Sequence, residues 1–71
     1  MNNYAMFRTE ACYNGRPVLI STVELPGYAR KTYETAILYK NMEDVRIWRT
    51  CDRMEAYRNH LAAIRFCEAT E

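Results

Sequence analysis

Hydrophobic and polar positions are arranged with one period over residues 4 to 51 and with another after them. Four runs rich in β-branched and aromatic residues predict strands. These runs are Tyr4 to Tyr13, Val18 to Leu25, Tyr33 to Lys40 and Val45 to Cys51. From Asp52 onwards, apolar residues recur every three or four positions, which predicts an amphipathic helix from about Arg53 to Glu68.

Short polar segments separate the predicted strands. Asn14-Gly15 is a strong hairpin signal, because both residues accept positive φ, and Pro26-Gly27 ends the second run. Parallel neighbours would need crossovers of about a dozen residues or more, which these connections lack. The sequence therefore predicts a single α+β domain over residues 1–71. Its four-stranded antiparallel β-meander is followed by one C-terminal helix, in the order β-β-β-β-α.

The predicted helix has a start signal and a broad apolar side. Asp52 is a candidate N-cap, with Glu55 three residues later as in a capping box. An apolar stripe is expected to pack on the sheet, widened on one side by smaller residues. The stripe is Met54, Tyr57, Leu61 and Ile64, and the widening residues are Ala56, His60, Ala63 and Cys67.

One helix covers only one face of a four-stranded sheet, and the predicted strands carry apolar side chains on both faces. In the fourth strand, for example, Ile47 and Trp48 point to opposite faces. A large uncovered apolar surface on so small a protein indicates a partner. We expect a homodimer formed through the open sheet face or a sheet edge. The alternative is a monomer with scattered exposed aromatic residues.

Aromatic and basic side chains are the expected interface residues. With Val45 and Ile47 facing the helix, Trp48 and Tyr39 become the desolvated anchors of a protein interface and Arg46 orients the partner. With Trp48 under the helix, the anchors are instead Ile37, Tyr39 and Ile47. Alternation alone leaves both assignments open, because both faces are apolar.

Length and charge restrict the function classes. The chain has 71 residues, ten basic against nine acidic side chains and a formal charge of +1. This size excludes a multidomain enzyme. No apolar run approaches the roughly 20 residues that span a bilayer. The N-terminus lacks a basic flank before an apolar core, so we expect a cytoplasmic protein without membrane contact.

Residues suited to catalysis or metal binding are few. His60 is the only histidine, and we interpret it as a packed or boundary residue rather than a general base. Three widely spaced cysteines (Cys12, Cys51 and Cys67) indicate reduced, partly buried thiols rather than a zinc site, although His60 and Cys67 share a helix face. Glu43-Asp44 is interpreted as a solvated turn. The sequence therefore predicts a non-enzymatic protein with no cofactor and no metal.

Nucleic acid is the alternative partner. Arginines in the C-terminal half, together with Arg30 and Lys31 in the loop after Pro26-Gly27, accompany tyrosines that can stack on unpaired bases. The charges are balanced along the chain, however, so no segment has the basic excess that drives phosphate binding. Binding of another protein is therefore the first expectation.

Several short stretches resemble small uncharacterised proteins of bacteriophages and prophages of Gram-positive bacteria. These are Tyr33 to Leu38, Asp52, Glu55-Ala56 with His60 four residues later, and Pro17 to Pro26. Arg53-Met54 departs from the acidic helix start usual in that group. The resemblance implies a mobile-element origin and no particular reaction.

Two further likenesses concern function. The order of four strands and a helix is similar to a single-stranded-DNA-binding transcriptional-coactivator fold that works as a dimer, and this implies nucleic-acid binding as an alternative. Phages also encode proteins of this size that inhibit host defence proteins, including anti-CRISPR inhibitors. Both likenesses concern size or fold alone and imply no site residues.

Overall fold

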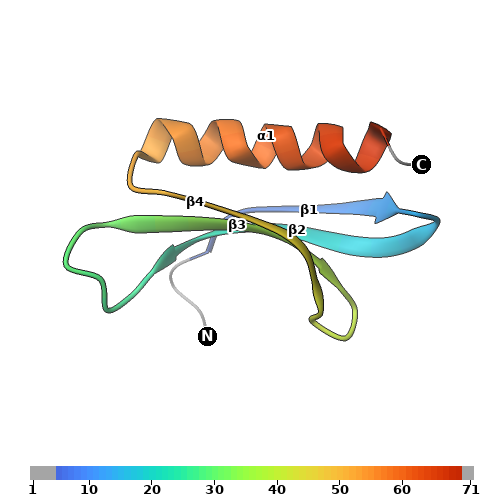
Figure 1. The fold of residues 1–71 in the computed structure, drawn as a ribbon, viewed down its shortest axis with the longest axis horizontal. Helices are drawn as coiled ribbons and strands as arrows, with labels where there is room; N and C mark the ends of the chain where they lie inside the picture. The colour runs from blue at the N-terminus through green and yellow to red at the C-terminus, as the bar shows by residue number, and fades with distance from the viewer. Residues whose placement is uncertain (1–4, 70–71) are drawn as a thin grey trace.

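Four strands form one antiparallel sheet, and a single helix lies across one of its faces (Figure 1). The computed structural model describes residues 5–69. Its elements are β1 (Ala5–Tyr13), β2 (Arg16–Leu25), β3 (Thr32–Tyr39), β4 (Asp44–Thr50) and α1 (Arg53–Ala69). The predicted meander and C-terminal helix are confirmed. Tyr4, the first residue of the predicted first strand, lies outside the described residues.

The order of the strands in the sheet follows the chain, so β1 and β4 are its edges. Asn14 and Gly15 have φ angles of 53° and 73°, which match the two-residue hairpin turn predicted for them. This turn places Tyr13 opposite Arg16 and thereby sets the register of β1 on β2. Pro17 follows outside the part of β2 that pairs with β3, so its missing N–H removes no ladder bond.

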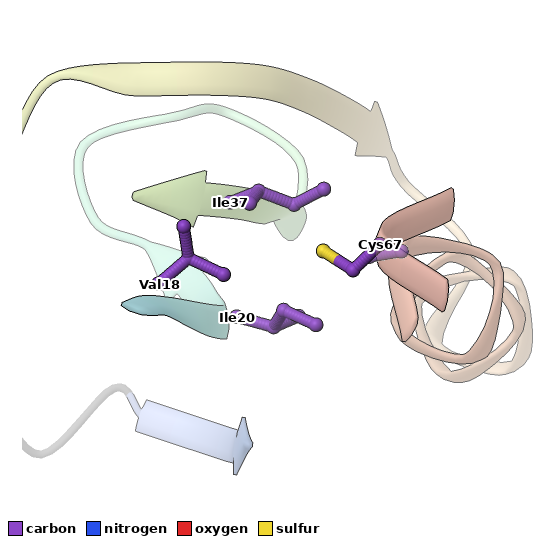
Figure 2. Close-up of a cluster of buried hydrophobic side chains, with 5 residues drawn as sticks. Val18, Ile20, Ile37 and Cys67 are labelled. Atoms are coloured by element: carbon purple, nitrogen blue, oxygen red, sulfur yellow. The ribbon is translucent and has the colours of Figure 1, made fainter. Parts of the chain in front are cut away.

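The hydrophobic core lies between α1 and alternate residues of the two central strands. Figure 2 shows Val18 and Ile20 of β2 and Ile37 of β3 gathered against Cys67 of the helix. Ile20 and Ile37 are directly paired across the strands, and both are fully buried. Burial of such a side chain contributes about 1.5 to 3 kcal/mol. These residues therefore set which face of the sheet the helix covers.

The helix packs through its small residues, not through the stripe expected from the sequence. Its buried residues are Ala56, His60, Ala63 and Cys67. Met54, Tyr57 and Leu61 are exposed, and Ile64 is only half-buried. The expected stripe was wrong because the row of small residues allows close approach to the sheet. The larger apolar side chains then lie along one flank of the helix.

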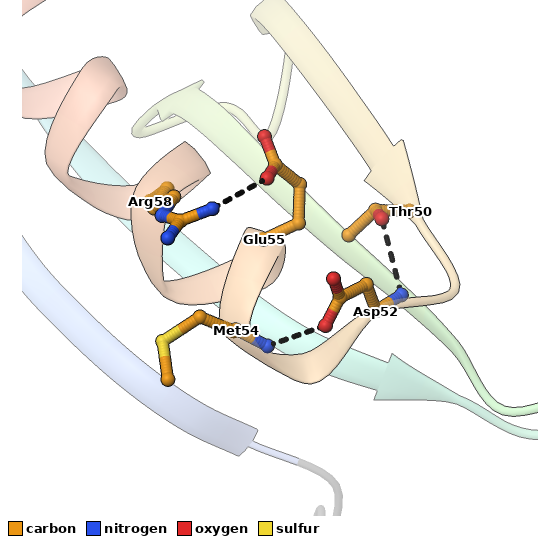
Figure 3. Close-up of polar contacts among 5 residues, drawn as sticks. All are labelled: Thr50, Asp52, Met54, Glu55 and Arg58. Carbon is orange, nitrogen blue, oxygen red and sulfur yellow. Dashed lines mark hydrogen bonds and ion pairs between the residues drawn. The ribbon is translucent and has the colours of Figure 1, made fainter.

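Asp52 caps the start of the helix, as predicted. Its Oδ1 accepts a 2.9 Å hydrogen bond from the backbone N–H of Met54 (Figure 3). The second half of the expected capping box is not formed. Glu55 instead pairs with Arg58 at 3.4 Å, and the backbone N–H of Asp52 donates to the Thr50 hydroxyl at 3.1 Å.

Candidate functional site

The sheet face opposite α1 is covered by no other element of residues 5–69 (Figure 1). We call it the open face. Because successive side chains of a strand point to opposite faces, it is formed by the residues that alternate with the core positions. They are Arg8, Glu10, Leu19, Ser21, Val23, Glu34, Ala36, Leu38, Ile47 and Arg49.

An apolar strip crosses the middle of the open face. Leu19 of β2 lies opposite Leu38 of β3, and Ala36 of β3 lies opposite Ile47 of β4. Ala36 is buried by its neighbours, Leu19 and Leu38 are half-buried, and Ile47 is 40% exposed. Three strands thus present adjoining apolar side chains that nothing in the described chain covers.

Charged side chains border this strip. Arg49 Nε donates a 2.9 Å hydrogen bond to Glu34 Oε2, directly across β3 and β4. This hydrogen bond and the negative charge of Glu34 raise the pKa of Arg49. Because Arg49 is largely open to solvent, this pair contributes little to the stability of the fold.

A furrow of about 440 Å³ extends from β1 over Leu19 and Leu38 to the turn after β3. Its walls include Leu19 and Leu38, and its margins include Arg8, Glu10 and Lys40. Arg8 and Lys40 make no salt bridge within residues 5–69. The furrow can therefore receive an apolar side chain with a carboxylate beside it.

The structure corrects the face assigned to the expected anchors. The Trp48 ring meets the Phe66 ring of α1 edge-on at 6.3 Å, so Trp48 packs under the helix. Tyr39 lies opposite Val18 and packs against the same core. Arg46 lies over the Trp48 ring at 4.8 Å, also on the covered side. The first assignment of Trp48, Tyr39 and Arg46 to the open face is therefore wrong.

Of the residues in the alternative assignment, one lies on the open face. Ile37 is fully buried in the core and Tyr39 lies on the covered side, whereas Ile47 reaches the open face. Val45 packs against the core, because the irregularity opposite Ile37 and Leu38 interrupts the alternation in β4.

Trp48 and Tyr39, which were expected on the open face, form a cluster with other rings and two arginines on the covered face. The cluster lies near the hairpin between β1 and β2. The Tyr13 ring stacks on the Phe66 ring, with ring centres 5.5 Å apart, and its centre lies 6.4 Å from that of Tyr39. The guanidinium of Arg16 lies 4.0 Å from the centre of the Tyr39 ring. Arg46 lies over Phe66 at 5.2 Å as well as over Trp48. These cation–π contacts close the end of the core.

His60 belongs to a buried polar network. Its Nε2 lies 2.8 Å from the Thr9 hydroxyl, and its Nδ1 lies 2.8 Å from the Thr22 hydroxyl. The Thr22 hydroxyl also lies 2.7 Å from that of Thr35. Burial lowers the pKa of His60, and a neutral ring supplies the one donor and one acceptor this chain of hydroxyls uses. Of the two interpretations of His60, packed and boundary, the structure supports the packed residue.

The remaining candidate residues lie apart from one another. Cys67 is buried, whereas Cys12 and Cys51 are exposed, contrary to the partial burial expected of all three. No group of three or more His, Cys, Asp or Glu within residues 5–69 is placed to hold a metal ion. Glu43 and Asp44 are exposed beside the turn before β4, where the Asn41 side chain accepts the backbone N–H of Glu43 at 3.1 Å.

Comparison with known proteins adds no relative: no family model, curated protein or solved structure matches this chain. None of the described helical segments is long and apolar enough to cross a membrane.

Sequence reasoning missed Leu19 and Leu38 as the centre of a candidate site. Their signal was the alternation within β2 and β3, in which they occupy the positions between core residues. Trp48 and Tyr39 were instead expected as the interface anchors because they are aromatic. The register of the sheet, together with the side on which α1 lies, separates the two sets.

Proposed function

We propose that this protein is a non-enzymatic homodimeric module that binds another protein through its open face. The apolar strip of Leu19, Leu38 and Ile47 carries the proposal, since the single helix covers the other side of the sheet. An uncovered apolar area with a charged border is the usual composition of a protein interface.

The chemistry of the open face favours a particular kind of partner. An open sheet face with a shallow furrow suits a protein surface better than a small molecule, which needs an enclosing pocket. Lys40 at the furrow makes no salt bridge within the described chain. The expected partner therefore presents apolar side chains flanked by carboxylates.

Two further expectations belong to the proposal. Exposed free thiols persist in reducing compartments, so Cys12 and Cys51 favour a cytoplasmic location. The resemblance of Tyr33 to Leu38 and of the helix start to small phage proteins favours a mobile-element origin. Inhibition of a host defence protein is then one role that such a binding module can serve.

Site-specific photocrosslinking tests the proposal. A photoreactive residue at position 47 samples the open face, and one at position 62, exposed on the outer side of α1, is the matched control. We expect proteins that crosslink at position 47 and not at position 62. Each protein that crosslinks only at position 47 is then purified, and its Kd for this protein is measured by titration.

Ile47→Glu should raise the Kd of the purified partner about tenfold or more, because it places a charge in a desolvated interface. Ala62→Glu should leave the Kd unchanged. The proposal fails if both positions crosslink the same proteins, if neither crosslinks any, or if Ile47→Glu leaves binding intact.

Single-stranded nucleic acid is a second candidate, favoured by the aromatic and arginine cluster of Tyr13, Tyr39, Trp48 and Phe66 with Arg16 and Arg46. Neither arginine has a carboxylate partner within residues 5–69. Both guanidiniums already lie over ring faces, however, so bases would have to displace them.

Titration with an oligothymidylate separates this second candidate from protein binding. Binding at about 50 mM salt that weakens steeply as salt rises would favour it, since neutralised phosphates release counterions. Arg46→Ala should then reduce both the affinity and the salt dependence. Absence of binding at that salt concentration excludes this function.

A further inference from the structure

The two edges of the sheet differ in how they are protected. Pairing in β4 is irregular opposite Ile37 and Leu38, which interrupts the edge as a template for another strand. In β1 the irregularity lies at its beginning, between Ala5 and Phe7, and the register is regular from Phe7 to Tyr13. Residues 7 to 13 contain neither lysine nor proline, two common guards of an edge. The β1 edge is therefore the better template for pairing with another strand.

The hairpin turn determines which backbone groups point outwards from β1. Tyr13 and Arg16 flank a two-residue turn, so this pair exchanges both backbone hydrogen bonds. Hydrogen-bonded and non-hydrogen-bonded pairs then alternate along the ladder. Arg8, Glu10 and Cys12 accordingly direct their N–H and C=O groups away from β2, towards whatever lies beside the edge.

Charge selects one register for a second copy of this strand. In an antiparallel twofold pair centred on Thr9, Arg8 of each chain lies opposite Glu10 of the other, and β1 overlaps along its whole length. A shift of two residues either way places Arg8 opposite Arg8 or Glu10 opposite Glu10. Like charges directly opposite each other destabilise a strand pair, and opposite charges stabilise it.

The helix offers an apolar surface beside the same edge. Tyr57 contacts Phe7 of β1, with ring centres 5.7 Å apart, so this flank of α1 lies on the β1 side. Met54, Tyr57 and Leu61 are exposed along it, Leu61 by 36%. Leu61 follows His60, which contacts Thr9, and is therefore level with the centre of the proposed strand pair. The polar residues Glu55 and Asn59 lie on the opposite flank.

We infer that the protein dimerises through β1, with Thr9 of one copy opposite Thr9 of the other. This inference rests on the homodimer proposed above and specifies how it forms. The two sheets join into one of eight strands, and both helices lie on the same side. Their flanks of Met54, Tyr57 and Leu61 face each other, while both open faces stay free for another protein.

Charge exchange at exposed positions tests the register. Arg8→Glu should raise the dissociation constant of the dimer about tenfold or more, because two glutamates then oppose each other at both symmetric sites. Glu10→Arg should do the same with two arginines. The double variant Arg8→Glu/Glu10→Arg should restore the dimer, and an equimolar mixture of the two single variants should form a mixed dimer. Light scattering and sedimentation over a range of concentrations measure each mass.

Two more variants distinguish the edge from the open face as the dimer interface. Leu61→Glu should weaken an edge dimer and Ile47→Glu should not, with Ala62→Glu as the helix control. Glu10→Pro should abolish the edge dimer yet leave the chain folded, since the N–H that it removes points outwards.

The outcomes separate this inference from the proposed function. If the dimer ignores the charge exchanges and Leu61→Glu but dissociates with Ile47→Glu, β1 pairing is wrong and the homodimer stands. A monomer at all accessible concentrations overturns both. Open-face binding of a partner is measured separately by the photocrosslinking experiment, so its result does not depend on the dimer.

Discussion

The interface between α1 and the sheet has two halves of different chemistry. Towards the hairpin end it is apolar, formed by Val18, Ile20, Ile37 and Cys67. Towards the start of the helix it is polar, formed by Thr9, Thr22, Thr35 and His60. The apolar half contributes through buried area and close packing, whereas each polar group depends on its hydrogen-bond partner. The comparison teaches that the apolar residues supply the stabilisation from buried area, whereas the polar residues specify which groups must lie opposite each other.

The apolar half should give the largest single effect. Ile37→Ala should lower the free energy of unfolding by about 3 to 4 kcal/mol, because it removes buried area and leaves a cavity. Urea denaturation monitored by circular dichroism measures the change. Ile47→Ala, on the open face, is the matched control and should cost less than about 1 kcal/mol. Equal losses for the two variants would contradict the assigned faces.

In the polar half, His60→Ala should lower the free energy of unfolding by about 2 to 3 kcal/mol. The variant leaves Thr9 without its ring partner and removes one of the two partners of Thr22. The half-buried neighbour Asn59 provides a control, since Asn59→Ala removes no bond of the network. A loss below about 0.5 kcal/mol for His60→Ala would show that the network does not stabilise the fold.

A smaller effect is expected at the end of the network. Thr35→Val keeps the shape of the side chain and removes the hydroxyl that lies 2.7 Å from Thr22, whose bond to His60 remains. The expected loss is about 1 kcal/mol by the same denaturation measurement. A double-mutant cycle with His60→Ala should show a coupling energy different from zero, because the two side chains share Thr22.

The smallest change should come from pH. Burial lowers the pKa of His60 below its unfolded value of 6.5, so the unfolded chain binds the proton more readily. Stability should be complete above about pH 6.5 and should fall as the pH drops through the folded pKa. The charged ring keeps its packing, so the loss should be smaller than that caused by His60→Ala. His60→Gln should remove this dependence, because the chain has no other histidine.

Local patterns accounted for the elements of this fold. Asn14-Gly15 determined the first hairpin because both residues adopt positive φ there. Asp52 determined the start of α1 because its carboxylate accepts a bond from the backbone N–H of Met54. Such signals depend on neighbours within a few residues, so the sequence alone predicted the order, the meander and the helix.

The sides of those elements were decided only by the tertiary structure. β4 carries Ile47 and Trp48 on opposite faces, and hydrophobicity does not distinguish them; the contact between Trp48 and Phe66 does. Ala56, Ala63 and Cys67 took the buried face of α1 because small side chains allow close approach. Thr9 and Thr22, far apart in the chain, both meet His60, and Thr35 joins them through Thr22, because the strand register brings these threonines together. Hydrophobic attraction has no direction. The hydrophobic pattern alone therefore shows that some apolar residues of each element are buried, and strand register and close fit determine which residues these are.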